Sequence, residues 1–164
     1  MGIIKLNENE LKCFTIEAKL NGWASGKKAK KLSDGGREFV YKKGLYQYRD
    51  VYYGSPNFLG TEIVWWKNNA VWAMGYYGMV DNAACEEDIN TVLNEALNRV
   101  EDIINMLVPV RGPYEYDSKK KAGYKYLNEP QGHFGKFAGT ERVVKEQSLP
   151  FLLWYQGGMI QKIT

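Results

Sequence analysis

Residues 62–77 read EIVWWKNNAVWAMGYY, and this stretch decides the fold class. Two runs rich in branched and aromatic residues, Glu62–Lys67 and Ala70–Tyr77, flank Asn68-Asn69. Such residues favour strands, and asparagine tolerates the positive φ that a two-residue type I′ turn requires. The stretch therefore predicts an antiparallel hairpin.

The register of this hairpin assigns each side chain to one face of the sheet. With Asn68-Asn69 as the turn, Trp65 lies opposite Trp72, and directly opposed residues share a face. One face then carries a heavy apolar set that we expect to form core beneath a helix, namely Ile63, Trp65, Trp72, Met74 and Tyr76. The other face carries a carboxylate and aromatics around very small side chains, which leaves room for a ligand: Glu62, Val64, Trp66, Val71, Ala73, Gly75 and Tyr77.

Two further segments predict helices. Apolar residues recur at helical spacing after Asn7, a favourable N-cap, and Asn21-Gly22 offers a left-handed stop. The clearest helical periodicity runs from Glu86 to Leu107, and Pro109 ends it. We expect one short and one long amphipathic helix.

The rest of the chain favours strands separated by turns. These predicted strands are Glu38–Lys42 and Leu45–Tyr53, joined at Lys43-Gly44, and segments around Tyr124–Leu127, Thr140–Lys145 and Phe151–Tyr155. We therefore expect a single α+β domain over residues 1–164. Its strongly curved antiparallel sheet, of about six to eight strands, packs against one long and one short helix.

Composition narrows the function classes. Lys and Arg number 22 against 19 Asp and Glu, a net charge of +3, which lacks the dense basic stripe of nucleic-acid binders. Cys13 and Cys85 belong to no CxxC or Cys/His cluster, so we expect neither a zinc site nor a disulfide framework. No apolar run reaches membrane-spanning length, and Met1–Leu6 has no signal-like core. We expect a cytoplasmic protein with no membrane partner.

Several uncommon residue groups follow one another in a fixed order. They are Ala24-Ser25-Gly26, Tyr46–Asp50 with Tyr53-Gly54, Phe58–Glu62 with Val64-Trp65, Val71-Trp72, Tyr76–Gly78, Arg111–Pro113 and Tyr155–Gly158. Over nearly the whole chain this order resembles the bacterial domain-of-unknown-function family 5680, a name that carries no activity. The family is sometimes joined to an N-terminal helix-turn-helix regulator. Here the resemblance already includes Leu11 without that module, so we expect a stand-alone domain.

Arg49 and Asp50 are the first candidates for binding chemistry. As neighbours in a strand they point to opposite faces, Arg49 with Tyr53 and Asp50 with Tyr48. A buried arginine requires a carboxylate, a phosphate or an aromatic face to offset its desolvation. For Arg49 the candidates are Glu62 and an external anion, so a structural ion pair and a ligand site both stay open.

Arg111 lies on a predicted loop after the long helix, where it would bind a ligand or cap helix carbonyls. Two arginines converging with aromatic rings would suit a planar ring that carries a phosphate, through stacking and guanidinium forks. The candidate ligand-binding residues are Tyr48, Arg49, Asp50, Tyr53, Glu62, Trp66, Tyr77 and Arg111.

Signals for catalysis are weak. The only histidine, His133, has no Ser or Cys beside it placed as a nucleophile, and no phosphate-loop, dinucleotide or metalloprotease motif occurs. We expect no cofactor and no metal. We expect a protein that senses or sequesters a small anionic, ring-containing, nucleotide-like molecule, as a phage anti-defence sponge would.

Two alternatives stay open beside this expectation. One is a hydrolase or lyase that acts on such a ligand through Glu62, Asp50 and Arg111, with Glu141 as a further carboxylate. The other is a protein–protein interaction module that docks through exposed aromatics such as Trp66 and Tyr77. A homo-oligomer is compatible with each of these functions.

Overall fold

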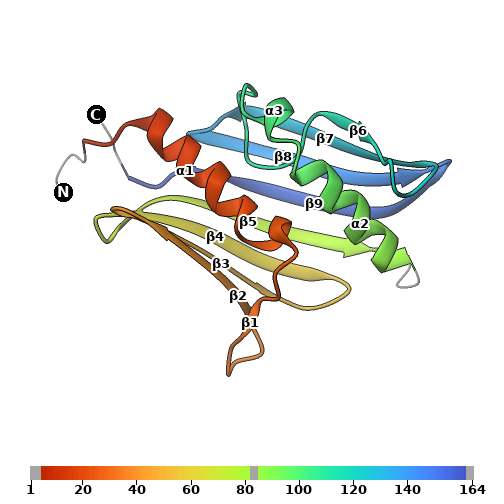
Figure 1. Ribbon diagram of the computed structural model, residues 1–164, viewed down its shortest axis with the longest axis horizontal. Coiled ribbons are helices and arrows are strands. Elements are labelled where there is room, and N and C mark those ends of the chain that lie inside the picture. Colours follow the sequence, from red (N-terminus) through yellow and green to blue (C-terminus); the bar gives the residue numbers. More distant parts are fainter. Residues whose placement is uncertain (1–4, 82–84, 162–164) are drawn as a thin grey trace.

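The architecture is α+β and is built on one large antiparallel sheet. The computed structural model describes residues 5–81 and 85–161. The strands are β1 (Lys30–Lys31), β2 (Arg37–Lys43), β3 (Tyr46–Tyr53), β4 (Phe58–Trp66), β5 (Asn69–Val80), β6 (Glu115–Asp117), β7 (Tyr124–His133), β8 (Lys136–Lys145) and β9 (Ser148–Met159). They lie in the order β1-β2-β3-β4-β5-β9-β8-β7-β6, so two meanders meet where β5 pairs with β9 (Figure 1).

The nine strands exceed the predicted six to eight. The difference includes the edge strands β1 and β6, which have only two and three residues. A periodic pattern cannot reveal strands this short, because neighbouring strands and not sequence periodicity fix their extended conformation.

The helices lie on one side of the sheet, which bends around them (Figure 1). They are α1 (Glu8–Leu20), the 3₁₀ turn η1 (Trp23–Ser25), α2 (Glu86–Leu97) and α3 (Val100–Ile103). The side chain of Asn7 accepts hydrogen bonds from the backbone of Asn9 and Glu10, which confirms the predicted N-cap of α1. We call the helix-covered side of the sheet the inner face and the other side the outer face.

The long helix predicted from Glu86 to Leu107 is wrong beyond Leu97. At Asn98 the chain leaves the helix, and the Asn98 amide donates to the carbonyls of Asn94 and Ala24. The contact with Ala24 ties the end of α2 to η1, and the chain turns before the four-residue α3 begins. The apolar periodicity continues through this break because apolar side chains of both helices line one cavity, namely Ile89, Leu93 and Leu97 of α2 and Val100 and Ile103 of α3.

The first helix ends at Asn21-Gly22 as predicted, but the predicted left-handed conformation at this stop is wrong. Asn21 ends α1 with φ of −91°, an ordinary right-handed conformation, and the chain continues into η1. The left-handed residue is Gly26, with φ of +72°, which ends η1. This continuation places Trp23 beneath the sheet.

The β4–β5 hairpin differs from the prediction by one residue at its turn. Lys67 and Asn68 have the positive φ values of 48° and 64°, and Trp66 pairs with Asn69. An irregularity between Val64 and Trp65 then shifts the register a second time.

As a result, the predicted faces of β4 are wrong, whereas Trp72, Met74 and Tyr76 of β5 lie in the core as predicted. Val64 pairs with Trp72 and Glu62 pairs with Met74, so both lie on the inner face with the core. A one-residue shift exchanges the faces of a strand, because side chains alternate with a period of two. Glu62 therefore faces the helices, and Tyr77 faces outward.

The core fills the space between the inner face and the helices. Its members include Leu11, Phe14, Val64, Trp72, Met74, Val92, Phe137 and Leu153. Within the described ranges, no helix combines the length and apolarity needed to cross a membrane. The first four residues of the predicted non-signal N-terminus, 1–4, lie outside the described residues.

Candidate functional site

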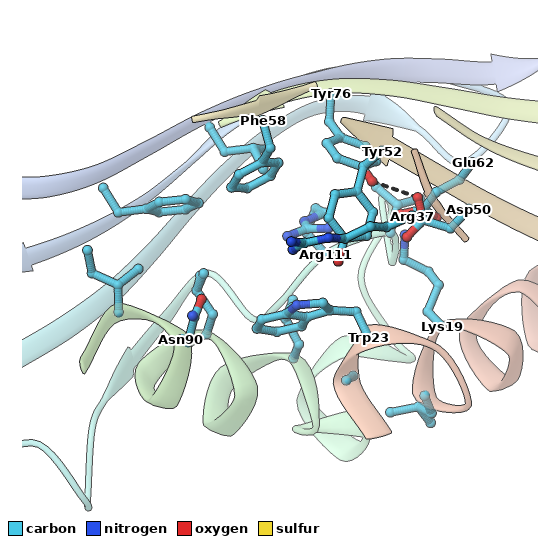
Figure 2. Close-up of a pocket in the computed structure, with 18 of the residues that line it drawn as sticks. Lys19, Trp23, Arg37, Asp50, Tyr52, Phe58, Glu62, Tyr76, Asn90 and Arg111 are labelled. Atoms are coloured by element: carbon cyan, nitrogen blue, oxygen red, sulfur yellow. Dashed lines mark hydrogen bonds and ion pairs between the residues drawn. The ribbon is translucent and has the colours of Figure 1, made fainter. Parts of the chain in front are cut away.

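A cavity of about 190 Å³ lies between the inner face and the helices (Figure 2). Strands β3, β4, β5 and β9 form one wall, and α1, η1, α2 and the segment around Arg111 form the other. Arg37, Ser55 and Asn90 line the cavity and are also exposed to solvent, so they mark its opening. Trp23 and Phe58 face the cavity from opposite walls (Figure 2).

Glycines in the strands make room for the aromatic wall. Gly60 pairs with Tyr76, and Gly78 pairs with Phe58. A Cβ atom added at Gly60 would lie 2.4 Å from the Tyr76 hydroxyl oxygen, and one at Gly78 would lie 2.4 Å from the Phe58 ring. Each ring therefore lies over the glycine of the neighbouring strand, and this explains the Phe-x-Gly and Tyr-Tyr-Gly groups in the sequence.

Charged side chains gather at the polar end of the cavity, which we define as Lys19, Tyr48, Asp50, Glu62, Tyr76 and Arg111. Asp50 on β3 and Glu62 on β4 are directly opposed, so two carboxylates lie side by side on the inner face. Lys19 of α1 pairs with Glu62, and their side chains are only 16% and 4% exposed. The Tyr76 hydroxyl donates to Oδ1 of Asp50 at 2.6 Å.

Arg111 is held at the polar end by Glu141 of β8. Its Nε and Nη2 atoms both donate to the Glu141 carboxylate, with 2.9 Å between Nη2 and Oε1. The two side chains are 12% and 0% exposed. This bidentate geometry is among the strongest that a carboxylate accepts.

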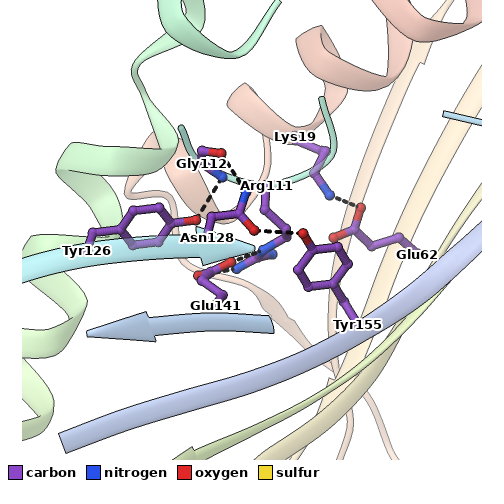
Figure 3. A network of polar contacts seen from close by, with 8 residues as sticks. All are labelled: Lys19, Glu62, Arg111, Gly112, Tyr126, Asn128, Glu141 and Tyr155. Atoms are coloured by element: carbon purple, nitrogen blue, oxygen red, sulfur yellow. Dashed lines mark hydrogen bonds and ion pairs between the residues drawn. The ribbon is translucent and has the colours of Figure 1, made fainter. Parts of the chain in front are cut away.

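A hydrogen-bond network fixes the backbone next to Arg111 (Figure 3). The Gly112 amide donates to the Tyr126 hydroxyl at 2.9 Å, and the Asn128 amide donates to the Gly112 carbonyl at 2.8 Å. Tyr155 in turn donates to the Asn128 side-chain oxygen at 2.7 Å. The sequence signal for this network is Arg111-Gly112-Pro113, because a Cβ atom at Gly112 would lie 2.6 Å from the Tyr126 ring.

Burial shifts the proton affinity of these groups. Burial and the charge of Glu62 raise the pKa of Asp50 to about 7, against the opposing effects of Tyr76, Lys19 and Arg111. Burial lowers the pKa of Lys19, against the opposing charge of Glu62. Burial lowers the pKa of Arg111, but the charge and hydrogen bonds of Glu141 raise it by more. The pKa of Arg111 therefore lies well above its ordinary value. Asp50 therefore changes charge near neutral pH.

Four of the eight predicted site residues meet in this cavity: Tyr48, Asp50, Glu62 and Arg111. Of the two partners left open for Arg49, Glu62 is wrong. Arg49 lies on the outer face, 44% exposed, and its Nε atom donates to Glu38 at 2.6 Å. Glu62 opposes Asp50, the strand neighbour of Arg49, so Glu62 and Arg49 are on different faces.

Three predicted aromatic residues also lie outside the cavity. The Tyr53 hydroxyl donates to Asp34 at 2.7 Å, and Tyr77 stacks on Trp154 with ring centroids 6.2 Å apart. Trp66 lies at the hairpin end beneath the Lys67 ammonium group, 4.3 Å from its ring centroid. The predicted convergence of Arg49 and Arg111 with these rings is therefore wrong.

A different arginine enters the cavity with Arg111, namely Arg37 of β2 (Figure 2). Arg37 pairs in register with Tyr52, which shares the inner face with Asp50. Among the residues that the structure describes, Arg37 forms no ion pair. Sequence reasoning missed it because a single charged residue at a strand end resembles ordinary solvated surface.

Lys19, Trp23 and Tyr76 were also missed. A lysine in the last turn of a helix is ordinarily explained by the helix dipole, so Lys19 gave no signal of its burial. Trp23 gave no signal because it follows the end of the first helix and belongs to no segment predicted as helix or strand. Tyr76 was expected in the core, and its hydroxyl reaches the cavity through its contact with Asp50.

These features define a helix-covered antiparallel sheet with an aromatic-walled cavity that has a charged inner end. The chain belongs to the family described as Domain of unknown function (DUF5680), whose family model matches residues 50–160. This confirms the resemblance seen in the sequence. No curated protein and no solved structure matches the chain.

The matched range does not include every part of the cavity. Asp50, Glu62, Tyr76 and Arg111 fall within residues 50–160. By contrast, the α1, η1 and β2 contributions to the cavity precede it, as do Ala24–Gly26 and most of Tyr46–Asp50. The family match therefore includes Asp50, Glu62, Tyr76 and Arg111 of the polar end, but not Lys19, Tyr48 or the aromatic wall residue Trp23.

Proposed function

We propose that this protein binds a small ring-containing molecule in the cavity and holds it unaltered, either to sense it or to sequester it. The cavity volume of about 190 Å³ is below the roughly 300–1,000 Å³ typical of pockets for drug-sized ligands. One ring system with a short substituent suits such a volume. Trp23 and Phe58 provide aromatic faces on opposite walls for stacking.

The observation that carries this proposal is the Asp50 carboxylate. It is 6% exposed, yet within the described part of the chain its side chain accepts a hydrogen bond from Tyr76 alone. A buried carboxylate is costly unless hydrogen bonds and charges compensate it. The other carboxylates nearby already have cationic partners, Lys19 for Glu62 and Arg111 for Glu141. A ligand donor at Asp50 would complete the site.

Arg37 supports an anionic group on the ligand. Its guanidinium enters the cavity near the opening and has no carboxylate partner among residues 5–81 and 85–161. A phosphate or carboxylate substituent would accept charge-assisted hydrogen bonds there. The ring would then occupy the interior and the anion the opening, which fits the nucleotide-like ligand expected from the sequence.

The pKa of about 7 at Asp50 also favours a second candidate, an enzyme that uses this group as a general acid or base on the same ligand. The two functions differ in what happens to the ligand. A binding protein releases it intact, and a hydrolase or lyase releases it chemically changed.

The test begins with native mass spectrometry of the protein from its host, followed by denaturation and identification of any released molecule. A panel of nucleotides and ring-containing metabolites is then screened by thermal shift. A true ligand at about 100 times its Kd is expected to raise Tm by about 5–10 °C. An empty protein with no stabilising compound in the panel would contradict the proposal.

Two matched substitutions place any binding in the cavity. Arg37→Ala is expected to weaken binding of an anionic ligand about tenfold or more, because it removes a charge-assisted hydrogen bond. Arg49→Ala removes an exposed arginine from the outer face and is expected to leave the Kd unchanged. Equal losses in the two variants would show that binding depends on general surface charge and not on the cavity.

A further inference from the structure

The polar end combines a hydrogen-bond acceptor, Asp50, with two cations whose donors are not all used, Lys19 and Arg111. Lys19 pairs with Glu62, which lies directly opposite Asp50, and Arg111 lines the same cavity. The Lys19 ammonium has three donors and contacts Glu62. Arg111 has five donors, and two of its nitrogens contact Glu141. Donors of both cations are therefore available for a ligand.

We propose that the cavity selects a ring with a 2-amino-4-oxo edge, numbered in the pyrimidine ring, which is the edge that guanine and pterin share. This inference rests on the proposed function. On such an edge a ring N–H and an amino group lie side by side, next to a ring carbonyl. The N–H and the amino group donate to Asp50, and the carbonyl accepts from Lys19 or Arg111.

Other common rings match this arrangement less well. Adenine would present an unprotonated ring nitrogen to the carboxylate, which repels it. Hypoxanthine lacks the amino group and leaves one carboxylate oxygen without a donor. Uracil has carbonyls on both sides of its ring N–H, and the one that takes the place of the amino group repels the carboxylate. Xanthine has a carbonyl in place of the amino group, which is repulsive. A paired edge of this kind discriminates against a wrong base by roughly 5- to 150-fold.

The remaining walls fit the same ligand. The indole of Trp23 faces the cavity from η1, and Phe58 faces it from β4, so a flat bicyclic ring can stack between the helix layer and the sheet (Figure 2). Arg37 and Asn90 at the opening are placed for the substituent of the ring, a ribose phosphate on guanine or a polar side chain on pterin.

The experiment is isothermal titration calorimetry on the full chain with four probes. They are guanosine 5′-monophosphate, inosine 5′-monophosphate, xanthosine 5′-monophosphate and pterin-6-carboxylate. Either the guanosine or the pterin probe is expected to bind at least about tenfold more tightly than the inosine and xanthosine probes. Which of the two binds identifies the source of the edge.

Each failure has its own meaning. If adenine, uracil or another ring binds and these two probes do not, the selectivity for a 2-amino-4-oxo edge is overturned and the proposed function stands. If no ring-containing compound binds and the native protein is empty, the proposed function itself fails. Equal affinity for the guanosine and inosine probes also overturns the selectivity.

An Asp50→Asn substitution tests the residue assigned to this edge. The asparagine amide supplies a donor where xanthine presents its carbonyl, so the preference for guanosine over xanthosine monophosphate is expected to fall at least about tenfold. Asp117→Asn is the matched control, because Asp117 is exposed on β6, away from the cavity. If a folded Asp50→Asn protein keeps the wild-type preference, the assignment of Asp50 is overturned. The comparison of the four probes on the wild-type protein tests the selectivity itself and does not depend on any variant.

Discussion

Arg49 and Asp50 are neighbours in β3, and they show how differently the two faces of this sheet treat a charge. On the outer face Arg49 is 44% exposed and pairs with Glu38. On the inner face Asp50 is 6% exposed, and its pKa rises to about 7. Solvent stabilises a charge on the outer face, whereas burial on the inner face removes that stabilisation. A charged side chain is therefore ordinary surface on the outer face and part of a candidate site on the inner face.

Tyr76 and Tyr77 repeat this contrast on β5, two strands further along the sheet. The Tyr76 hydroxyl is buried against Asp50, and burial raises its pKa well above the ordinary tyrosine value. Tyr77 is an exposed ring that stacks on Trp154. A tyrosine on the inner face therefore interacts through a buried hydrogen bond to a carboxylate, whereas its neighbour on the outer face interacts through ring stacking.

The largest expected difference between the faces concerns ion pairs. Glu141→Gln leaves the buried Arg111 without its carboxylate and is expected to lower the free energy of unfolding by about 3–5 kcal/mol. Glu38→Gln breaks the exposed pair with Arg49 and is expected to cost about 0–1 kcal/mol. Urea denaturation measures both, and equal losses would contradict the distinction between the faces.

The next effect is the pH dependence of stability. The pKa of Asp50 is raised in the folded protein, so between about pH 4 and pH 7 the folded state binds more protons at Asp50 than the unfolded state. Asp50 therefore lowers stability as pH rises through this range, by an amount on the order of a few kcal/mol. The groups that face it are Lys19, Tyr48, Glu62, Tyr76 and Arg111.

Asp50→Asn removes the proton-binding group and is expected to gain stability relative to wild type as pH rises from 4 to 7. The measurement is urea denaturation at several pH values on both proteins, with Asp117→Asn as the exposed control. A difference between wild type and Asp50→Asn that does not change with pH would mean that Asp50 keeps its ordinary pKa.

The smallest of these effects tests the glycines beneath the rings. Gly60→Ala places a Cβ atom against the Tyr76 hydroxyl and is expected to cost about 1–3 kcal/mol and to weaken ligand binding. Gly75→Ala lies on the same hairpin in open space, with no atom within 4 Å of the added carbon. It is expected to be neutral or to stabilise by about 0.5–1 kcal/mol. A Gly60 variant as stable as wild type would show that Tyr76 moves freely.

Local periodicity accounts for what the sequence revealed of the site. Alternation along a strand placed Arg49 and Asp50 on opposite faces, and the fit of Asn7 as a helix cap is equally local. The face of Glu62 was not predictable in the same way. A one-residue difference at the turn and an irregularity after Val64 change which residues share a face, and neither has a clear sequence signal.

By itself, the sequence determined an α+β fold built on an antiparallel sheet, because strand alternation and turn residues act over a few positions. Of the eight site residues that it singled out, Tyr48, Asp50, Glu62 and Arg111 line the cavity. Only the tertiary structure decided which cation meets which carboxylate. Lys19 meets Glu62 across 43 positions and Arg111 meets Glu141 across 30. Such contacts depend on how helices pack on a bent sheet, and the cavity at Asp50 arises from that packing.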